Sequence, residues 1–306
     1  MAQPKNILVV GRTGTIGGYI ALEAHSRGYA VTIGGRKSVK GVPILEDLPL
    51  IKGDYTASEY NAETLSTFDS VVFAAGADMR HVPENTSADE YYLLSAESAI
   101  AFARRARDAG VKRFVHIGSF YWHIAPELVD KTPYIRSRKI AAEGIASLSS
   151  PGFHACSLDA PWVVGTVPGM HSPMFAAYVQ FAEGKLGMEP SVIDANSNFV
   201  SIKALATAAI AALEKSESVS GRTILIGGEN MTFAEFFSVI FSAVGNNVPI
   251  SVTDQEHPLT PESALWAGRK IKAYEPDAEE EALLGGYRQY SVRDAVERVV
   301  REYRSA

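Results

Sequence analysis

Three glycines near the start of the chain have the spacing of a loop that binds phosphate. Gly11, Gly14 and Gly17 lie between an apolar run and an amphipathic stretch, in the sequence GRTGTIGG. In such a turn the first glycine permits a sharp change of direction, the second lets the backbone approach a pyrophosphate, and the third lets helix pack on strand. The helix that follows presents free N–H groups and its positive end to the phosphates. The pattern predicts a dinucleotide site lined by Gly11, Arg12, Thr13, Gly14, Thr15, Ile16 and Gly17.

A cationic pair follows the second apolar run, at the position that decides the form of the cofactor. Dinucleotide folds that prefer NAD have an acidic residue about 20 positions after the glycines, which binds the ribose 2′-hydroxyl. This sequence has Arg36 and Lys37 there instead. A guanidinium forms paired hydrogen bonds with a phosphate, and Arg12 could add a second positive charge. These residues favour NADP(H) over NAD(H), with an ordinary solvated loop as the alternative interpretation.

Composition and charge argue against several classes of protein. The 306 residues are 46% hydrophobic and 21% charged, and 35 acidic against 29 basic residues give a net charge of −6. Such a chain can bury a core, and its net negative charge argues against a general nucleic-acid or anionic-membrane binder, because both need a basic face. Seven histidines and one cysteine show no metal-ligand spacing, so no metal site is expected. The single cysteine and the absence of a long apolar run predict a cytoplasmic protein.

Short β-branched runs alternate with longer amphipathic stretches, which is typical of a parallel sheet with crossover helices. From about Gly165, frequent glycine and proline residues interrupt this alternation. We therefore expect a Rossmann-type doubly wound α/β sheet with a smaller C-terminal substrate lobe. The expected strands are 6–10, 29–33, 50–53, 70–75, 113–117 and 153–158, and the expected helices are 15–27, 88–109 and 133–148.

The expected dinucleotide-binding domain comprises residues 1–165 and about 195–228, because the run 199–214 and a strand at 223–226 are expected to return to the main sheet. The expected substrate-binding lobe comprises about 166–194 and 229–306. Parallel open sheets bind ligands at the carboxyl ends of their strands, so the site is expected at the seam between the lobes.

Several short motifs in a fixed order make a family resemblance specific. After the glycine turn come GD at 53–54, AAG at 74–76, HIGS at 116–119, YIRSR at 134–138, PWVVG at 161–165 and FVSI at 199–202. With these motifs nearly the whole chain resembles the extended branch of the short-chain dehydrogenase/reductase family. That branch includes epimerase/dehydratase and dihydroflavonol-reductase-like enzymes. The resemblance implies further cofactor contacts from Asp54, Ala74, Ala75, Gly76, Pro161, Trp162 and Val163.

The resemblance also implies the catalytic residues Ser119, Tyr134 and Arg138. In that family a tyrosine protonates a carbonyl oxygen while nicotinamide delivers hydride to the carbon, and a serine orients the oxygen. A free tyrosine has a pKa of about 10, so it needs a nearby fixed cation to exchange protons near neutral pH. Positions i and i+4 share one face of a helix, which places Arg138 beside Tyr134.

The sequence departs from the family pattern at three places. The family has lysine where this chain has Arg138, which keeps the charge but cannot release a proton. Lys139 points about 100° away on an ideal helix. The stretch 94–97 lacks the family's asparagine, and Lys203 stands where many relatives have aspartate. Tyr134 is therefore either the proton donor or an ordinary residue of an amphipathic helix.

Aromatic and apolar residues suggest the nature of the substrate. Phe120 and Tyr121 directly follow Ser119, so they are candidates for the pocket wall, with Tyr121 as a second candidate proton donor. Loop packing is the alternative for these two residues. Met170 and Phe175 lie in an apolar stretch of the substrate lobe. These residues point to a bulky or apolar small-molecule carbonyl substrate.

Three functions follow from these observations. The first is NADPH-dependent reduction of a ketone or aldehyde, with hydride from nicotinamide and the proton from Tyr134. The second is a NAD-dependent sugar-nucleotide epimerase or dehydratase. The third is a non-catalytic NADP-sensing regulator. Apolar positions between 91 and 103 would permit the homodimer that is common in the family.

Overall fold

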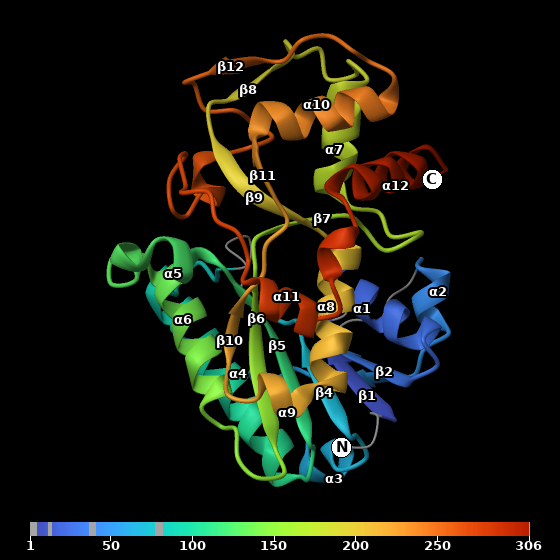
Figure 1. Cartoon of the computed structure of the whole chain (residues 1–306), viewed down its shortest axis with the longest axis vertical. Helices are drawn as coiled ribbons and strands as arrows, with labels where there is room; N and C mark the ends of the chain where they lie inside the picture. Colours follow the sequence, from blue (N-terminus) through green and yellow to red (C-terminus); the bar gives the residue numbers. More distant parts are fainter. Residues whose placement is uncertain (1–4, 12–13, 37–40, 77–81, 306) are drawn as a thin grey trace.

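A seven-stranded sheet is the centre of the computed structural model, which describes residues 5–11, 14–36, 41–76 and 82–305 (Figure 1). Its strand order is β10-β6-β5-β4-β1-β2-β3, and every neighbouring pair is parallel. The strands are β1 (Asn6–Val10), β2 (Ala30–Gly35), β3 (Leu50–Lys52), β4 (Ser70–Phe73), β5 (Arg113–Ser119), β6 (His154–Ala160) and β10 (Thr223–Leu225). The chain proceeds outward from β1 in both directions, which is doubly wound topology. The predicted Rossmann-type α/β fold is confirmed.

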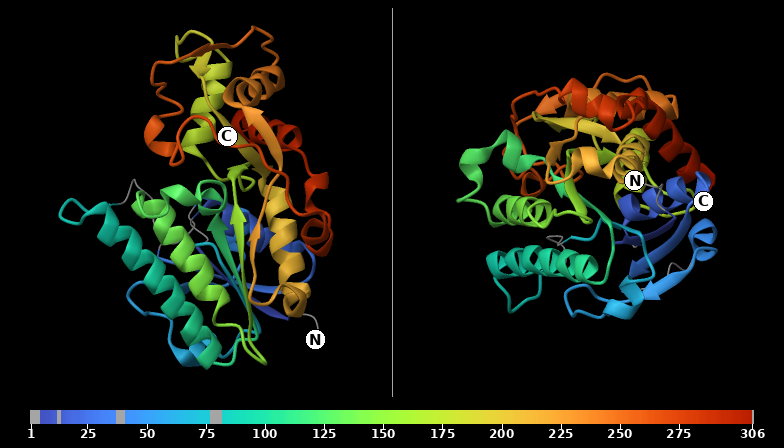
Figure 2. Two further views of the ribbon diagram at one scale, coloured as in Figure 1. Left: turned by 60° about the vertical axis from the view of Figure 1, so that its left-hand side comes forward. Right: turned by 60° about the horizontal axis from the view of Figure 1, so that its bottom comes forward.

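Helices cover both faces of this sheet. Figure 2 shows α4 and α6 side by side on one face, while α1 and α8 pack together on the other. The longer helices are α1 (Thr15–Ser26), α4 (Ala88–Asp108), α6 (Pro133–Ala146), α7 (Pro173–Ala182), α8 (Ile202–Glu214), α10 (Phe233–Val244) and α12 (Val292–Ser305). The short ones are α2 (Pro43–Glu46), α3 (Ala62–Leu65), α5 (Tyr121–Ile124), α9 (Ser216–Val219) and α11 (Ala278–Leu283). No helix in the described ranges is both long enough and apolar enough to cross a membrane.

Residues 7–10 of β1 form a continuous apolar run because they contact hydrophobic clusters on both sides of the sheet. Ile7 and Val9 pack in the hydrophobic cluster that contains α1 and α8 residues. Leu8 and Val10 point the other way, into the cluster that contains α4 residues. Successive side chains of a strand face opposite sides, and both sides of this sheet are covered, so residues 7–10 are all apolar, while Asn6 at the start of the strand is exposed.

Two smaller sheets form the upper part of the molecule (Figure 1). One contains β7 (Trp162–Val164), β9 (Asn196–Ser201) and β11 (Glu229–Thr232), and the other contains β8 (Ser191–Ile193) and β12 (Ser251–Thr253). The prediction that 199–214 and 223–226 return to the main sheet is therefore wrong for β9, which pairs with β7 and β11, but α8 packs with α1 on that sheet as predicted. It is right for β10, which pairs with β6. A run of apolar residues predicts a strand but does not say which sheet the strand joins.

Apolar residues of α7, α10 and α12 form the core of this upper part. Helix α10 begins with a capping box, in which the Thr232 hydroxyl and the Glu235 carboxylate satisfy each other's backbone N–H groups, and it ends at Gly245. Leu284 and Tyr287, by contrast, pack in the cluster of α1 and α8. The lobe boundaries expected from the sequence remain a prediction.

Candidate active site

Gly11 turns the chain at the end of β1 in a conformation that favours glycine. Its φ is +98°, and a Cβ atom there would lie 2.5 Å from the carbonyl carbon of Ala74. The Gly11 N–H donates to the carbonyl oxygen of Gly34 at 3.1 Å, so the turn lies against the ends of β2 and β4. Gly14 then caps α1 without a side-chain hydrogen bond from the described residues. The first N–H groups of α1 are thus available for an anion.

The rest of the glycine turn fits the predicted dinucleotide site. Gly17 is buried, whereas Thr15 and Ile16 are half-buried in the first turn of α1. A helix start without an acidic residue in its first turn keeps its positive end uncompensated. Arg12 and Thr13 belong to the prediction but lie outside the described residues.

Arg36 and Asp54 come together at the ends of β2 and β3. The Arg36 guanidinium lies 3.8 Å from the Asp54 carboxylate, and the arginine side chain is 68% exposed. Asp54 also accepts a hydrogen bond from the backbone N–H of Thr56 at 2.9 Å. The predicted cation and the predicted carboxylate therefore share one corner of the site. Lys37 lies outside the described residues.

The AAG motif follows β4 and meets the tyrosine helix. Ala74 continues the backbone pairing of β4, because its N–H donates to the Val10 carbonyl oxygen at 2.8 Å. Ala75 lines a small cavity with His116 and Arg138. A Cβ atom on Gly76 would lie 2.6 Å from an Arg138 guanidinium nitrogen. Glycine at position 76 therefore lets Arg138 reach the carboxyl edge of the sheet.

Tyr134 and Arg138 lie on successive turns of α6, which begins at Pro133. The Arg138 guanidinium lies over the Tyr134 ring, with its central carbon 4.7 Å from the ring centroid. This contact lies within the range of a cation–π interaction. Lys139 has other neighbours: its ammonium is 6.0 Å from the Trp122 ring and 3.9 Å from the Glu143 carboxylate. The cation beside the phenol is therefore arginine.

Ser119 ends β5 at the same edge of the sheet. It is 7% exposed and stands opposite Ala160 of β6. Helix α6 packs against β5 and β6, and α5, which follows Ser119 closely, packs against α6. Parallel strands present their carboxyl ends to the ligand in this fold class. The fold thus brings the serine-bearing strand and the tyrosine-bearing helix to one edge.

Trp266 is the closest aromatic neighbour of Tyr134, and sequence reasoning missed it. The two rings are stacked, with centroids 4.4 Å apart and planes inclined by 11°. Tyr92 of α4 packs edge-on against both rings, at 5.4 and 5.9 Å. Trp266 lies in irregular chain far along the sequence, so no periodic pattern places it beside α6.

A buried polar chain crosses from β5 to β6 beneath this edge. His116 Nδ1 lies 2.8 Å from Ser157 Oγ, which donates to one Asp159 oxygen at 2.6 Å. The other Asp159 oxygen lies 2.8 Å from His123 Nε2. Because the serine proton is directed to Asp159, His116 must donate from Nδ1. Burial raises the pKa of Asp159, and burial followed by the charge of Arg138 lowers the pKa of His116 to about 3.

A family model matches residues 7–227, and its description is NAD dependent epimerase/dehydratase family. The chain belongs to this family. The match extends from β1 to the residues after β10, so it includes the glycine turn, Ser119 and the Tyr134–Arg138 pair. It confirms the resemblance to extended short-chain dehydrogenases/reductases. Comparison with curated protein sequences finds no match.

Solved structures of other proteins share the fold over the full length. A UDP-glucose 4-epimerase from Stenotrophomonas maltophila, with bound NAD and formylated UDP-arabinopyranose, has a TM-score of 0.77 and 18% identity, with 98% of each chain covered. A UDP-N-acetylglucosamine 4-epimerase from Bacillus cereus has a TM-score of 0.74 and 19% identity, covering 99% of this chain and 97% of that one. The enzyme WbmG from Bordetella bronchiseptica, in complex with NAD, has a TM-score of 0.75 and 18% identity, covering 99% and 95%.

The remaining predicted cofactor residues lie where β6 leads into β7. Pro161 separates the two strands. The Trp162 ring packs edge-on against Phe233 at 5.2 Å, in the core of the upper part. Val163 packs instead against the core of the main sheet. In this family member the PWVVG motif thus joins the two parts of the fold.

The four predicted substrate-pocket residues fall into two groups. Phe120 and Tyr121 cluster with Tyr134 and with the residues around Trp266. Met170 and Phe175 line a different hollow, between the start of α7 and α12. The structure therefore does not bring the two pairs together. Within the described ranges, no group of three or more His, Cys, Asp or Glu side chains is arranged to hold a metal ion.

Proposed function

We propose that this protein transfers hydride at a carbon that bears a hydroxyl or carbonyl oxygen, with Tyr134 moving the proton of that oxygen. The observation that carries the proposal is the Tyr134–Arg138 pair, with the guanidinium 4.7 Å from the phenol ring. A phenol beside a fixed cation can lose and regain its proton more readily than a phenol in water. Ser119, at the end of β5, would orient the reacting oxygen.

The edge of the sheet fits a nicotinamide dinucleotide. The glycine turn lies so close to the end of β4 that a Cβ atom at Gly11 would collide with the Ala74 backbone. The first turn of α1 would offer N–H groups to a pyrophosphate. When bound, the cofactor supplies or accepts the hydride. Gly11, Gly14 and Gly17 would hold the phosphates, while Arg36 and Asp54 would stand at the adenosine ribose.

The residues of the chain would handle the proton and the charge. In the reducing direction Tyr134 gives its hydroxyl proton to the substrate oxygen, and in the oxidising direction it takes that proton back. The Ser119 hydroxyl donates to the same oxygen as negative charge develops on it. Arg138 would supply a fixed positive charge beside the Tyr134 ring and stabilise negative charge on the phenol oxygen.

A sugar nucleotide is the first candidate substrate. The family description and the neighbouring structures, which contain NAD and UDP-sugars, support epimerisation or dehydration of such a compound. Both reactions would use hydride removal and return with no net consumption of cofactor. The protein would be incubated with NAD⁺ and UDP-glucose, and separately with UDP-N-acetylglucosamine, and the products identified by NMR. A new epimer or a dehydrated keto sugar supports this candidate.

Arg36 favours a second candidate, the NADPH-dependent reduction of a ketone or aldehyde. Its guanidinium is 68% exposed and 3.8 Å from the Asp54 carboxylate, and such a group at the end of the second strand would pair with the 2′-phosphate of NADP. Three cations in and near the segment around Trp266 have carboxylate partners, which lowers the positive charge there for a substrate diphosphate. These pairs are Arg269 with Glu262, Lys270 with Asp194, and Arg288 with Glu275.

Calorimetric titration with NADP⁺ and NAD⁺ separates the two candidates. If Arg36 binds a 2′-phosphate, NADP⁺ binds at least about tenfold more tightly, or about 1.4 kcal/mol. Arg36→Ala should then remove most of this difference and leave NAD⁺ binding unchanged. Equal or tighter NAD⁺ binding contradicts the second candidate. Binding without turnover of the sugar nucleotides or of a panel of ketones and aldehydes would contradict both.

A homodimer is a further part of this proposal. Helix α4 exposes Leu93 and Leu94, which are 38% and 56% accessible. Apolar side chains on the outer face of a helix favour contact with a second copy. Light scattering at micromolar concentration, compared with a Leu94→Lys variant, would test this: a monomer in both cases contradicts it.

A further inference from the structure

Residues 265–274 form an irregular segment, here named the strap, that carries Trp266 onto Tyr134. The strap follows the short 3-10 helix Glu262–Ala264 and runs from the upper part toward α11 (Figure 1). Trp266, Ile271 and Tyr274 pack in one cluster with Phe120 and the residues around it. Irregular chain has no ladder of backbone hydrogen bonds, so other contacts must fix its position.

Asn196 of β9 holds the middle of the strap. Its side-chain amide donates to the Ile271 carbonyl oxygen at 3.1 Å, and its side-chain oxygen accepts from the Ile271 N–H at 2.8 Å. The Asn196 backbone N–H also donates to the Arg269 carbonyl oxygen at 2.8 Å. A carboxamide carries both a donor and an acceptor, so it pairs with a peptide group as a neighbouring strand would.

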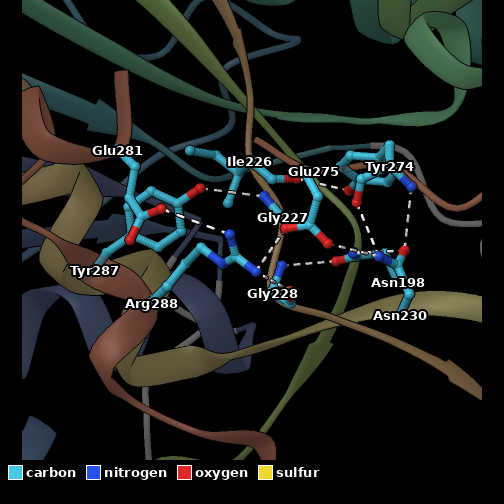
Figure 3. Close-up of polar contacts among 10 residues, drawn as sticks. All are labelled: Asn198, Ile226, Gly227, Gly228, Asn230, Tyr274, Glu275, Glu281, Tyr287 and Arg288. Carbon is cyan, nitrogen blue, oxygen red and sulfur yellow. Dashed lines mark hydrogen bonds and ion pairs between the residues drawn. The ribbon is translucent and has the colours of Figure 1, made fainter. Parts of the chain in front are cut away.

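Asn230 of β11 makes the same arrangement at the end of the strap. Its amide donates to the Tyr274 carbonyl oxygen at 2.9 Å, and its oxygen accepts from the Tyr274 N–H at 3.3 Å. Figure 3 shows Asn198 on the other side of Asn230, where it donates to the same oxygen at 3.0 Å. Asn198 accepts in turn from the Gly228 N–H at 2.7 Å. Each amide is thereby held in one orientation.

The end of the strap is also joined to the main sheet. The Tyr274 hydroxyl donates to the carbonyl oxygen of Ile226, directly after β10, at 2.7 Å (Figure 3). The next residue, Glu275, pairs with Arg288 at 2.8 Å. The Tyr121 hydroxyl donates to the Ala264 carbonyl oxygen at 3.4 Å, directly before the start of the strap. Both ends of the segment are therefore tied, with Trp266 between them.

We propose that Asn196 and Asn230 are positioning residues that hold Trp266 against Tyr134, and that Trp266 is thereby the wall that decides which substrates reach the Tyr134 hydroxyl. The stacked indole, 4.4 Å from the phenol centroid, covers a face of that ring. A substrate must then approach the hydroxyl past the edge of the indole. This inference rests on the proposed role of Tyr134 as proton donor.

The asparagines are well placed to act on the strap without carrying the fold. Backbone pairing joins β9 to β7 and to β11 whatever the side chains at 196 and 230. Both asparagines point their amides at strap backbone rather than into the hydrophobic core. Their removal should therefore release the strap while the sheets and helices remain folded.

The first test measures the shielding of Trp266. The emission of Trp266 is the part of the fluorescence that Trp266→Phe removes. Quenching of this emission by acrylamide should rise in the double variant Asn196→Ala/Asn230→Ala. Asn196→Asp keeps the acceptor and loses the donor, so its quenching should be intermediate. Asn246→Ala is the matched control, because Asn246 also donates to a backbone oxygen, that of Ala182, at 2.8 Å. Unchanged quenching in the double alanine variant overturns the proposal.

The second test separates substrate from cofactor effects. With whichever of UDP-glucose, UDP-N-acetylglucosamine or a panel ketone the wild type converts, the double variant should raise KM by about tenfold or more. The dissociation constant of the dinucleotide should not change, and kcat should change less than KM. Released Trp266 with an unchanged KM overturns the inference. If the wild type converts none of these compounds, the proposed function fails, while the quenching comparison still decides whether the asparagines position Trp266.

Discussion

The guanidinium of Arg138 and the phenol of Tyr134 face each other one helical turn apart, 4.7 Å from carbon to ring centroid. The same guanidinium touches the position of Gly76, where a Cβ atom would lie 2.6 Å from one of its nitrogens. The cation therefore connects the end of β4, where a dinucleotide would lie, with the residue proposed to move the proton.

Tyr134→Phe should abolish turnover and leave dinucleotide binding nearly intact. The substitution removes the hydroxyl and keeps the ring that stacks on Trp266 and faces Arg138. Loss of a general acid–base group costs about a hundredfold to ten-thousandfold in rate. Steady-state kinetics and calorimetric titration of the variant check this. Surviving activity would move the proton donor elsewhere, with Tyr121 the first residue to replace.

Gly76→Ala should lower activity by displacing Arg138. The added Cβ would meet the flexible end of that side chain, so the fold should survive while the guanidinium shifts. Arg138→Lys removes the crowded fork but keeps a charge, so Gly76→Ala should cost less activity in that background. A double-mutant cycle on kcat measures the coupling, which residues in contact show and distant residues do not. Strict additivity would mean that Gly76 does not act through Arg138.

Gly11→Ala should destabilise the protein and abolish dinucleotide binding. The new Cβ would lie 2.5 Å from the Ala74 backbone, at a φ of +98°. Gly28→Ala is the matched control, because its φ is +86° but nothing lies within 4 Å of the added atom. The control should lose about 1–2 kcal/mol of unfolding free energy from backbone strain. Urea unfolding should show a distinctly larger loss at Gly11; equal losses would argue that the turn can move away from β4.

His116 should make the protein sensitive to acid. Its pKa in the folded protein is lowered to about 3, first by burial and then by Arg138. An unfolded histidine has a pKa of about 6.5, so below that pH the unfolded chain binds a proton that the folded chain does not. The unfolding free energy therefore does not depend on the protonation of His116 above a pH of about 6.5. As the pH falls from there toward 3, it decreases by up to about 1.4 kcal/mol per pH unit.

His116→Asn should flatten this dependence. Asparagine keeps a polar atom near Ser157 but takes up no proton, so its unfolding free energy should fall less between pH 6 and pH 4 than that of the wild type. His25→Asn, at an exposed position of α1, should follow the wild type. Parallel curves for wild type and His116→Asn would contradict the buried neutral state of His116.

The sequence predicts much of the main sheet and little of the wall around Tyr134. Strand 6–10 matches β1 residue for residue, because residues 7–10 are buried on both faces of the sheet and form an unbroken apolar run. The helix expected at 88–109 ends at Asp108, next to the expected boundary, because a capping box and a glycine mark its ends. These signals lie within a few residues of the element that they predict, so they can be recognised in a single sequence.

The contacts around the site depend on segments that are distant in the chain. Trp266 meets Tyr134 on a segment that Asn196 and Asn230 contact, and these three residues share no spacing that a sequence pattern would reveal. The contact between Asp159 and Gly118 is equally hidden in the sequence. A Cβ atom on Gly118 would lie 1.9 Å from an Asp159 carboxylate oxygen. The glycine of HIGS is visible in the sequence, but its partner across the strands is not.

The position of the chain's single thiol has a practical consequence. Cys156 is buried in β6, between β5 and β10, and burial raises its pKa to about 12. Thiol reagents and oxidants need an accessible thiolate, so the native molecule should neither react with them nor join a second copy through a disulfide. A maleimide dye can then label Cys156 only in molecules whose sheet has opened. The rate of labelling would report how often the centre of the fold opens, without an engineered cysteine.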